Sequence, residues 1–218
     1  MTDASPTTVQ IDIVSDIVCP WCVIGFRQLV KALEANGLKA NLRWHPFELN
    51  PDMPADGQNL RDHLVAKYGI TPAQSQENRA RLIELGADLG FDFQFNEDMR
   101  MWNTFQAHQL LDWADGQSAQ TALKQAMFKA HFTDNLNMSD SDVLVQVAES
   151  VGLDATEAGE VLGSGRHADA VRNKQQFWTS RGVTGVPAMI FAQKYLVTGA
   201  QGADNYGQIL QRCLAEAA

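Results

Sequence analysis

The chain has 218 residues and a formal net charge of −9, with 45% hydrophobic and 20% charged residues. This composition is typical of a folded globular protein and excludes a disordered or fibrous chain. The acidic balance argues against nucleic-acid and membrane-surface partners, since both require a basic face.

Residues 1–8 are polar and lack the basic start and apolar run of a secretory signal. No stretch approaches the roughly 18 consecutive apolar residues that a membrane-spanning helix needs. The three cysteines, Cys19, Cys22 and Cys213, are too few for a disulfide framework. We therefore expect a cytoplasmic protein in a reducing compartment.

The N-terminal part predicts a strand, a helix and a second strand. Residues 9–13 alternate between apolar and polar side chains, which is typical of a strand. Apolar side chains then recur with helical spacing over residues 26–33, and Asn36-Gly37 provides a stop signal. A second alternating run covers residues 40–44. A strand–helix–strand unit of this length predicts two parallel strands.

The pattern becomes helical from Pro51 to about Gly182. Thr71-Pro72-Ala73-Gln74 combines an N-cap, a proline at the first helical position and a capping-box glutamine. Similar helix-start signals occur at three later places, namely residues 103–106, 139–142 and 154–157.

Two short apolar runs, residues 188–192 and 195–198, then predict a hairpin, and residues 206–214 predict a final amphipathic helix. The order β-α-β, helical block, β-β-α predicts an α/β fold with a mixed four-stranded sheet and helices on its faces. Residues 1–50 and 183–218 would form the sheet domain. Residues 51–182 would form an inserted α-helical domain covering one end of the sheet.

The sequence Cys19-Pro20-Trp21-Cys22 lies between the first strand and the first helix. Two cysteines at this spacing can form a small disulfide if the backbone turns suitably. The helix N-terminus favours an anion, so Cys19 is the candidate nucleophile, and Cys22, one turn later, is the candidate resolving thiol. Pro20 contributes rigidity.

Two alternatives for the cysteine pair are a buried structural pair and half of a zinc site. Zinc would need two more ligands. Cys213 falls on an apolar helix stripe, and no histidine lies within ten residues of either Cys19 or Cys22. We therefore favour thiol chemistry and expect no metal.

Gly185-Val186-Pro187 directly precedes the third predicted strand. The sequence allows two interpretations of Pro187. It is either an ordinary proline at the first residue of a strand or a proline with a cis peptide bond. A cis bond is rare enough to imply a functional role.

Three further residues have a functional and a structural interpretation. Asp16 would either act on the Cys19 sulfur through its charge or cap the first helix, which we favour. His45 would either assist proton transfer or be a packed or solvated histidine, which we favour. Trp21 is expected to point outward and contact substrate.

Five aromatic residues form a cluster in the predicted helical insertion. Their default interpretation is core packing, with a groove for an apolar substrate as the alternative. Cys213 is interpreted as structural. The aromatic residues are Phe91, Phe93, Phe95, Trp102 and Phe105.

The combination of Cys19-Pro20-Trp21-Cys22, a long helical insertion and residues 183–187 before a hairpin resembles the DsbA family of thioredoxin-fold oxidoreductases. Three more segments, 15–18, 44–51 and 197–201, are similar to its FrnE-like subgroup. The resemblance covers about residues 9–214.

The resemblance implies a thiol–disulfide oxidoreductase with a cis peptide between Val186 and Pro187, next to the Cys19–Cys22 pair. The backbone of Val186 would then pair with an extended substrate segment. No organic cofactor is implied, since the two sulfurs carry the electrons. The expected partner is a thiol- or disulfide-containing substrate, with glutathione a candidate. Some members of the subgroup have an extra C-terminal cysteine pair, whereas this chain has only Cys213 there.

Two other functions are kept as alternatives. Kappa-class glutathione transferases and hydroxychromene-carboxylate isomerases share the implied fold, but usually have serine or another residue where Cys19 stands. The other alternative is a non-catalytic, chaperone-like binder that uses the aromatic cluster. Retention of both cysteines favours redox chemistry over the transferase and isomerase activities.

Overall fold

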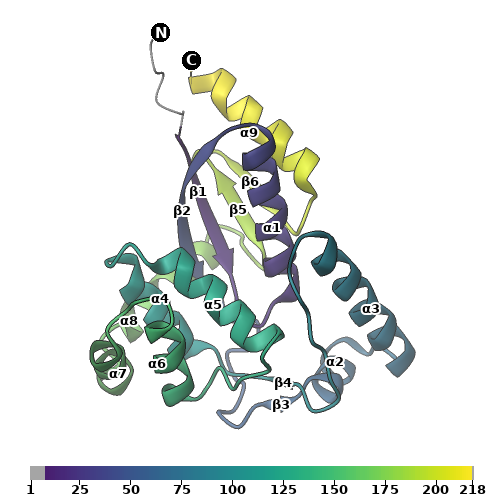
Figure 1. The fold of residues 1–218 in the computed structure, drawn as a ribbon, viewed down its shortest axis with the longest axis vertical. Helices are drawn as coiled ribbons and strands as arrows, with labels where there is room; N and C mark the ends of the chain where they lie inside the picture. Colours follow the sequence, from purple (N-terminus) through teal and green to yellow (C-terminus); the bar gives the residue numbers. More distant parts are fainter. Residues whose placement is uncertain (1–7, 218) are drawn as a thin grey trace.

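The computed structural model describes residues 8–217, so the segment 1–7 inspected for a signal sequence lies outside the described part. The centre of the fold is a four-stranded sheet in the order β2-β1-β5-β6 (Figure 1). Strands β1 and β2 are parallel, and the other neighbours are antiparallel. The strands are β1 (Thr8–Ser15), β2 (Lys39–Pro46), β5 (Ala188–Phe191) and β6 (Tyr195–Thr198).

The sheet confirms the predicted mixed topology. Strand β1 is central, and Ile11 pairs with Leu42 on one side and Phe191 on the other. The parallel β1–β2 pair requires a crossover, which is the helix α1 (Pro20–Ala35). Gly37, with φ 62°, provides the left-handed residue after this helix.

Helix α1 packs against the last helix, α9 (Ala203–Ala217), on one face of the sheet (Figure 1). The remaining helices gather at the end of the sheet to which β1 and β2 lead (Figure 1). They are α2 (Leu60–Tyr68), α3 (Pro72–Asp88), α4 (Phe105–Asp115), α5 (Gln120–Phe132), α6 (Ser141–Glu149), α7 (Ala155–Ser164) and α8 (Ala168–Thr179).

The helix-start signals are confirmed at α3 and α7, while the start of α6 is shifted by one residue. Thr71 and Gln74 form the predicted capping box, and Asp154 caps α7 through Glu157 N. Asp140, rather than Ser139, caps α6. The sequence did not predict a two-stranded sheet of β3 (Gln58–Asn59) and β4 (Arg100–Met101), because two-residue strands show no periodicity.

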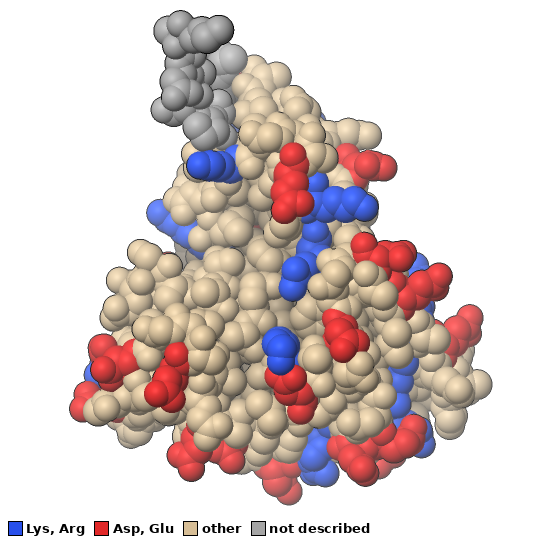
Figure 2. All heavy atoms as spheres, viewed as in Figure 1, with Lys and Arg blue, Asp and Glu red and all other residues tan. Residues whose placement is uncertain are grey.

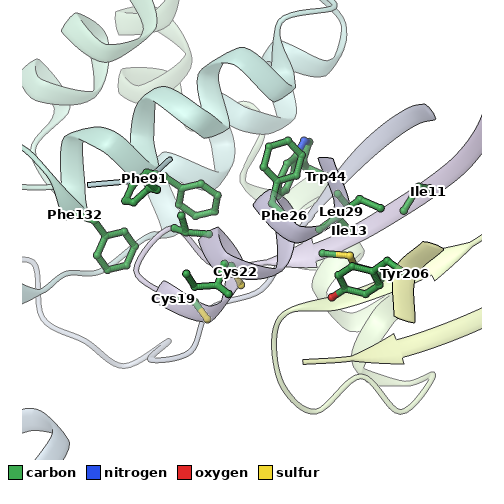
Figure 3. Packing of buried hydrophobic residues seen from close by; sticks show 14 of the residues in the cluster. Ile11, Ile13, Cys19, Cys22, Phe26, Leu29, Trp44, Phe91, Phe132 and Tyr206 are labelled. Carbon is green, nitrogen blue, oxygen red and sulfur yellow. The ribbon is translucent and has the colours of Figure 1, made fainter. Parts of the chain in front are cut away.

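Two large hydrophobic clusters and a small third one form the core of the described residues. The first joins the sheet, α1 and α9 to side chains of the helical part, including Leu82, Phe91 and Phe132 (Figure 3). The second lies within α4–α7 and also includes Ile17, from the loop before α1. The loop that carries the cysteine motif therefore lies where the sheet and the helical part meet.

Within residues 8–217, every helix is too short or too polar to span a bilayer. Acidic side chains lie over the helical end of the molecule, with Lys and Arg interspersed among them, on the face drawn in Figure 2.

Candidate active site

The two motif cysteines are held together at the start of α1 (Figure 3). Cys19 occupies the N-cap position with an extended backbone (φ −95°, ψ 108°), and Pro20 takes the first helical position. The N–H of Cys22 donates to the carbonyl oxygen of Cys19 at 3.1 Å. Both residues are free thiols, with exposed fractions of 3% for Cys19 and 1% for Cys22.

The loop before β5 lies against this helix start. The Val186–Pro187 peptide bond is cis. The Cys19 thiol donates to the carbonyl oxygen of Val186 at 3.6 Å. A Cβ atom on Gly25 of α1 would lie 3.2 Å from Cγ of Pro187, so the helix and the loop are in close contact. The structure thus brings Cys19, Val186 and Pro187 together, although 167 positions separate Cys19 from Val186.

A cavity of about 490 Å³ opens beside Cys19. This volume is within the range of small-molecule sites. Trp21, 38% exposed, forms part of its wall, and the Arg81 guanidinium lies 5.8 Å from the Trp21 ring centroid. Its other walls come from α2, α3, β4 and the segments around Leu49 and Val186. The wall residues are Val18, Cys19, Pro20, Trp21, Leu49, Asn50, His63, Leu64, Tyr68, Ile70, Asn78, Leu82, Met101 and Val186.

Asp16 is fully buried and does not cap α1, so the capping interpretation is wrong. Its carboxylate accepts hydrogen bonds from the N–H groups of Ile17 and Leu49, both at 2.7 Å. Its Oδ1 also lies 3.3 Å from Nε2 of His108. Burial alone would raise the pKa of Asp16, but His108 and the Leu49 N–H lower it below its ordinary value. Asp16 thus connects the loop before α1 to α4 and to the segment after β2.

The surroundings of the Cys22 thiol shift its pKa. Burial raises the pKa of Cys22 well above its ordinary value, and the neighbouring Cys19 raises it further. The positive charge of Lys124 and the backbone N–H of Asp16 act in the opposite direction. Cys22 is therefore held as a thiol, with a cation and an N–H donor that favour its thiolate.

Lys124 is a buried cation on α5, with an exposed fraction of 1%. Its Nζ lies 5.0 Å from the ring centroid of Phe128 and 5.5 Å from that of Trp44. Burial lowers the pKa of Lys124 to about 8, against the opposing influence of Cys22, Asp16 and Cys19. The two aromatic faces provide cation–π contacts to this ammonium group.

Sequence reasoning missed both His108 and Lys124. The sequence around each of them predicts only a packed helix. Their proximity to Asp16 and Cys22 depends on the tertiary fold. One signal was available for Lys124: it interrupts an apolar run that includes Leu123, Met127 and Phe128. A charged residue within a buried helix face requires a polar or aromatic environment.

His45 lies away from the cysteine pair, as the packed interpretation expected. Its Nε2 is 2.8 Å from Oδ1 of Asp12, and its ring is 4.8 Å from the ring centroid of Trp178. Burial lowers its pKa despite the partner carboxylate. It borders another cavity, of about 460 Å³, whose walls include neither Cys19 nor Cys22.

The aromatic residues of the helical part mainly form core. Phe91 and Phe93 are buried, with ring centroids 4.7 Å apart, and Phe132 packs edge-on to both. Cys213 is buried in the same cluster, in α9. Among residues 8–217, no three His, Cys, Asp or Glu side chains gather as possible metal ligands.

Comparisons with known proteins agree with this geometry. The model of the DSBA-like thioredoxin domain matches residues 10–211. The crystal structure of the probable DsbA oxidoreductase SCO1869 from Streptomyces coelicolor has a TM-score of 0.89 and 33% identity, covering 95% of this chain and 91% of that chain.

Two other similar proteins are more distant in sequence. An uncharacterized Bacillus subtilis protein, YwbO, is 25% identical over 200 residues, which cover 91% of this chain and 94% of the relative. The cytosolic disulfide reductase DsbM from Pseudomonas aeruginosa, solved with GSH, has a TM-score of 0.63 and 15% identity, covering 94% and 99% of the two chains.

Proposed function

Because this chain belongs to the family of DSBA-like thioredoxin domains, we propose that it is a thiol–disulfide oxidoreductase that uses Cys19 and Cys22. The observation that carries the proposal is the position of Cys19. It occupies the N-cap position of α1, its thiol contacts the carbonyl oxygen of Val186 at 3.6 Å, and it borders the 490 Å³ cavity. The helix N-terminus favours the thiolate that attack requires.

The reaction proceeds in two exchange steps. The Cys19 thiolate attacks one sulfur of a substrate disulfide, forming a mixed disulfide and releasing one substrate thiolate. Cys22 then loses its proton and attacks the Cys19 sulfur, which releases the second substrate thiolate. The Cys19–Cys22 pair gives up two electrons and the substrate gains them. The same steps in reverse oxidise a dithiol, and the surrounding redox poise sets the direction.

The raised pKa of Cys22 supports this division of roles. A protonated, fully buried Cys22 does not compete with Cys19 for substrate. Once the mixed disulfide has formed, the positive charge of Lys124 and the N–H of Asp16 favour the Cys22 thiolate. Cys22 is thus the resolving thiol, and Lys124 is a positioning residue that acts through it.

Trp21 and the loop at Val186–Pro187 are proposed to bind substrate, and Pro20 to keep the helix start rigid. The exposed Trp21 ring offers an apolar contact on the cavity wall. The backbone of Val186 faces Cys19 and offers polar groups to an extended substrate segment. These contacts place the reacting disulfide beside the Cys19 sulfur.

Glutathione is proposed as the recycling partner, in a reducing cytoplasmic compartment. The cavity is large enough for a small peptide, and the similarly folded DsbM has been solved with GSH. We also propose membership of the FrnE-like subgroup. Its characteristic segment after β2 supplies Leu49, whose N–H binds Asp16 below the cysteine motif.

The direct test is to trap the mixed disulfide. The Cys22→Ser variant, incubated with glutathione disulfide, should accumulate a Cys19–glutathione adduct detectable by mass spectrometry, because no resolving thiol remains. Cys19→Ser is the matched control and should form no such adduct at Cys22, which is buried.

The two alternative functions predict different results for the same cysteine variants. A glutathione-dependent transferase or isomerase would retain turnover in Cys22→Ser and lose it in Cys19→Ser. A non-catalytic binder would retain full suppression of client aggregation in the double variant. Either result, without the trapped adduct, would contradict the oxidoreductase assignment.

A further inference from the structure

The cavity of about 460 Å³ beside His45 lies on the face of the sheet that α1 and α9 leave uncovered. We call it the sheet cavity. Ile11 and Ile13 of β1 pack with α1 and α9 in the first cluster, and successive side chains of a strand point to opposite faces. Asp12, between them, therefore points to the other face, where it lines the sheet cavity. The volume is within the range of small-molecule sites.

The floor of the sheet cavity is a row of side chains that crosses all four strands. Arg43 of β2 is the cross-strand partner of Asp12, and Asp12 is also the partner of Ile190 in β5. Ile190 is in turn the partner of Leu196 in β6. Cross-strand partners point to the same face, and all four side chains line the cavity. The floor thus carries a cation at the β2 edge and apolar groups at the β6 edge.

The wall above this floor is the end of α8 and the turn that follows it. The Trp178 ring lies 4.8 Å from that of His45, and the Arg181 guanidinium lies 3.5 Å from the ring centroid of Phe177. Phe177 and Leu196, which both line the cavity, have exposed fractions of 45% and 47%. The cavity therefore offers an accessible aromatic and apolar surface next to a second cation.

The two arginines are open to a ligand. Arg43 and Arg181 are exposed residues, so an anion in the cavity can reach their guanidinium groups. In the part of the chain that the structure describes, the arginines that pair with carboxylates are others, namely Arg61, Arg79, Arg166, Arg172 and Arg212.

The one carboxylate that lines the sheet cavity already has partners. Asp12 Oδ1 lies 2.8 Å from Nε2 of His45, and Asp12 Oδ2 accepts from Nε2 of Gln10 at 3.2 Å. Burial lowers the pKa of His45, so its ring is neutral at pH 7. The ionised side chains of the cavity are then Asp12, Arg43 and Arg181, and their sum is positive. This charge favours an anionic ligand group.

We propose that the sheet cavity binds a small organic anion, in which Arg43 and Arg181 hold a carboxylate. The rest of the ligand is an aromatic or other apolar body that packs against Phe177, Trp178 and Leu196. This site goes beyond the proposed function, since neither Cys19 nor Cys22 lines it.

A matched pair of ligands tests the proposal. The compounds 3-phenylpropanoate and 3-phenylpropanamide have nearly the same shape, but only the first is charged at neutral pH. The indole N–H signal of Trp178 in a nitrogen-15 NMR titration, assigned with Trp178→Phe, reports binding. We expect 3-phenylpropanoate to bind with a dissociation constant of about 1 mM or lower. The amide should bind at least about 10-fold more weakly. Equal affinities, or no binding of 3-phenylpropanoate, would overturn the proposal.

Two variants locate the carboxylate. Arg43→Gln and Arg181→Gln should each weaken binding of 3-phenylpropanoate by about 3- to 10-fold, because each removes a charged donor. Binding of the amide should be unchanged. The control is Arg212→Gln, an exposed arginine of α9 on the other side of the sheet, which should change neither affinity. Circular dichroism verifies the fold of each variant. A charge preference that survives both cavity substitutions would overturn the proposal.

Three further results would assign the binding elsewhere. Acetate has the charge without the apolar body and should leave the Trp178 signal unchanged; an equal shift with acetate would overturn the proposal. A shift of the Trp21 indole signal in place of that of Trp178 would place the ligand in the cavity at Cys19. A wild-type dimer that Leu196→Glu dissociates would assign this face to a second copy of the chain. Either of these two results would also overturn the proposal.

Discussion

At the scale of single residues, the site depends on buried ionisable side chains below the cysteine pair. Asp16 and His108 lie 3.3 Å apart with side chains 1% and 2% exposed. Lys124 is also buried, and its charge favours the thiolate of Cys22. Such groups are costly to bury. Their position next to the reacting thiol is consistent with a function in tuning it.

The cost of burying Lys124 can be measured through its pH dependence. Its pKa is about 8 in the folded protein, below the ordinary value of 10.5. Below about pH 8 the Lys124 ammonium is charged in both the folded and the unfolded state. The folded state then carries the full free-energy cost of burying this charge. Between pH 8 and 10.5 the unfolded state holds more protons, so the stability of the folded wild type rises relative to a variant without this charge.

We therefore expect Lys124→Met to be more stable than the wild type by about 1–3 kcal/mol at pH 7, and the difference to shrink above pH 8. Urea unfolding of both proteins at several pH values measures the difference in their free energies of unfolding. Lys129→Met, an exposed lysine on the same helix, is the control and should change stability by less than about 0.5 kcal/mol. A destabilised Lys124→Met with no pH trend would contradict this account.

At the scale of elements, two glycines in helices have opposite roles. A Cβ on Gly86 of α3 would lie 2.5 Å from Cδ2 of Phe93 and 2.7 Å from the carbonyl oxygen of Phe91. Gly86 therefore allows α3 to approach the aromatic segment that packs into the first cluster. A Cβ on Gly159 of α7 would have nothing within 4 Å, so this glycine only lowers helix stability.

Gly86→Ala should lower the free energy of unfolding by about 1–3 kcal/mol, because backbone and ring atoms would have to move. Gly159→Ala should raise it by about 0.5–1 kcal/mol through helix propensity. Both values come from denaturant unfolding. Equal effects of the two substitutions would show that the close approach at Gly86 is unimportant.

Sequence reasoning was most successful at this scale. The β-α-β and β-β-α units, and the cap at Thr71, follow from periodicity and local hydrogen bonding, which a short window contains. The two cysteines were found because motif and helix start coincide. The partners of Asp16 were not found, because Leu49 and His108 reach it from segments 33 and 92 positions away.

At the scale of the whole molecule, the first cluster joins the two predicted domains. Leu82, Phe91 and Phe132, from residues 51–182, pack with Ile11 and Leu29 of the sheet part. The division into a sheet domain and an inserted helical domain stays a prediction, but a shared core couples their stabilities.

We expect both parts to unfold together. Far-UV circular dichroism reports mainly on the helices. Fluorescence of Trp44, which lies on β2 and contacts α5, reports on the shared core. With Trp44 as the only tryptophan retained, the two urea transitions should have the same midpoint. Two separate midpoints would show that the helical part unfolds independently.

The most direct test of the proposed function is a redox titration of the purified protein in glutathione buffers, from fully reduced to fully oxidised. Samples are quenched by alkylation and mapped by mass spectrometry. We expect Cys19 and Cys22 to become protected together, in one two-electron transition, while Cys213 stays alkylatable after denaturation. If no Cys19–Cys22 disulfide forms at any ratio of reduced to oxidised glutathione, the dithiol mechanism is contradicted.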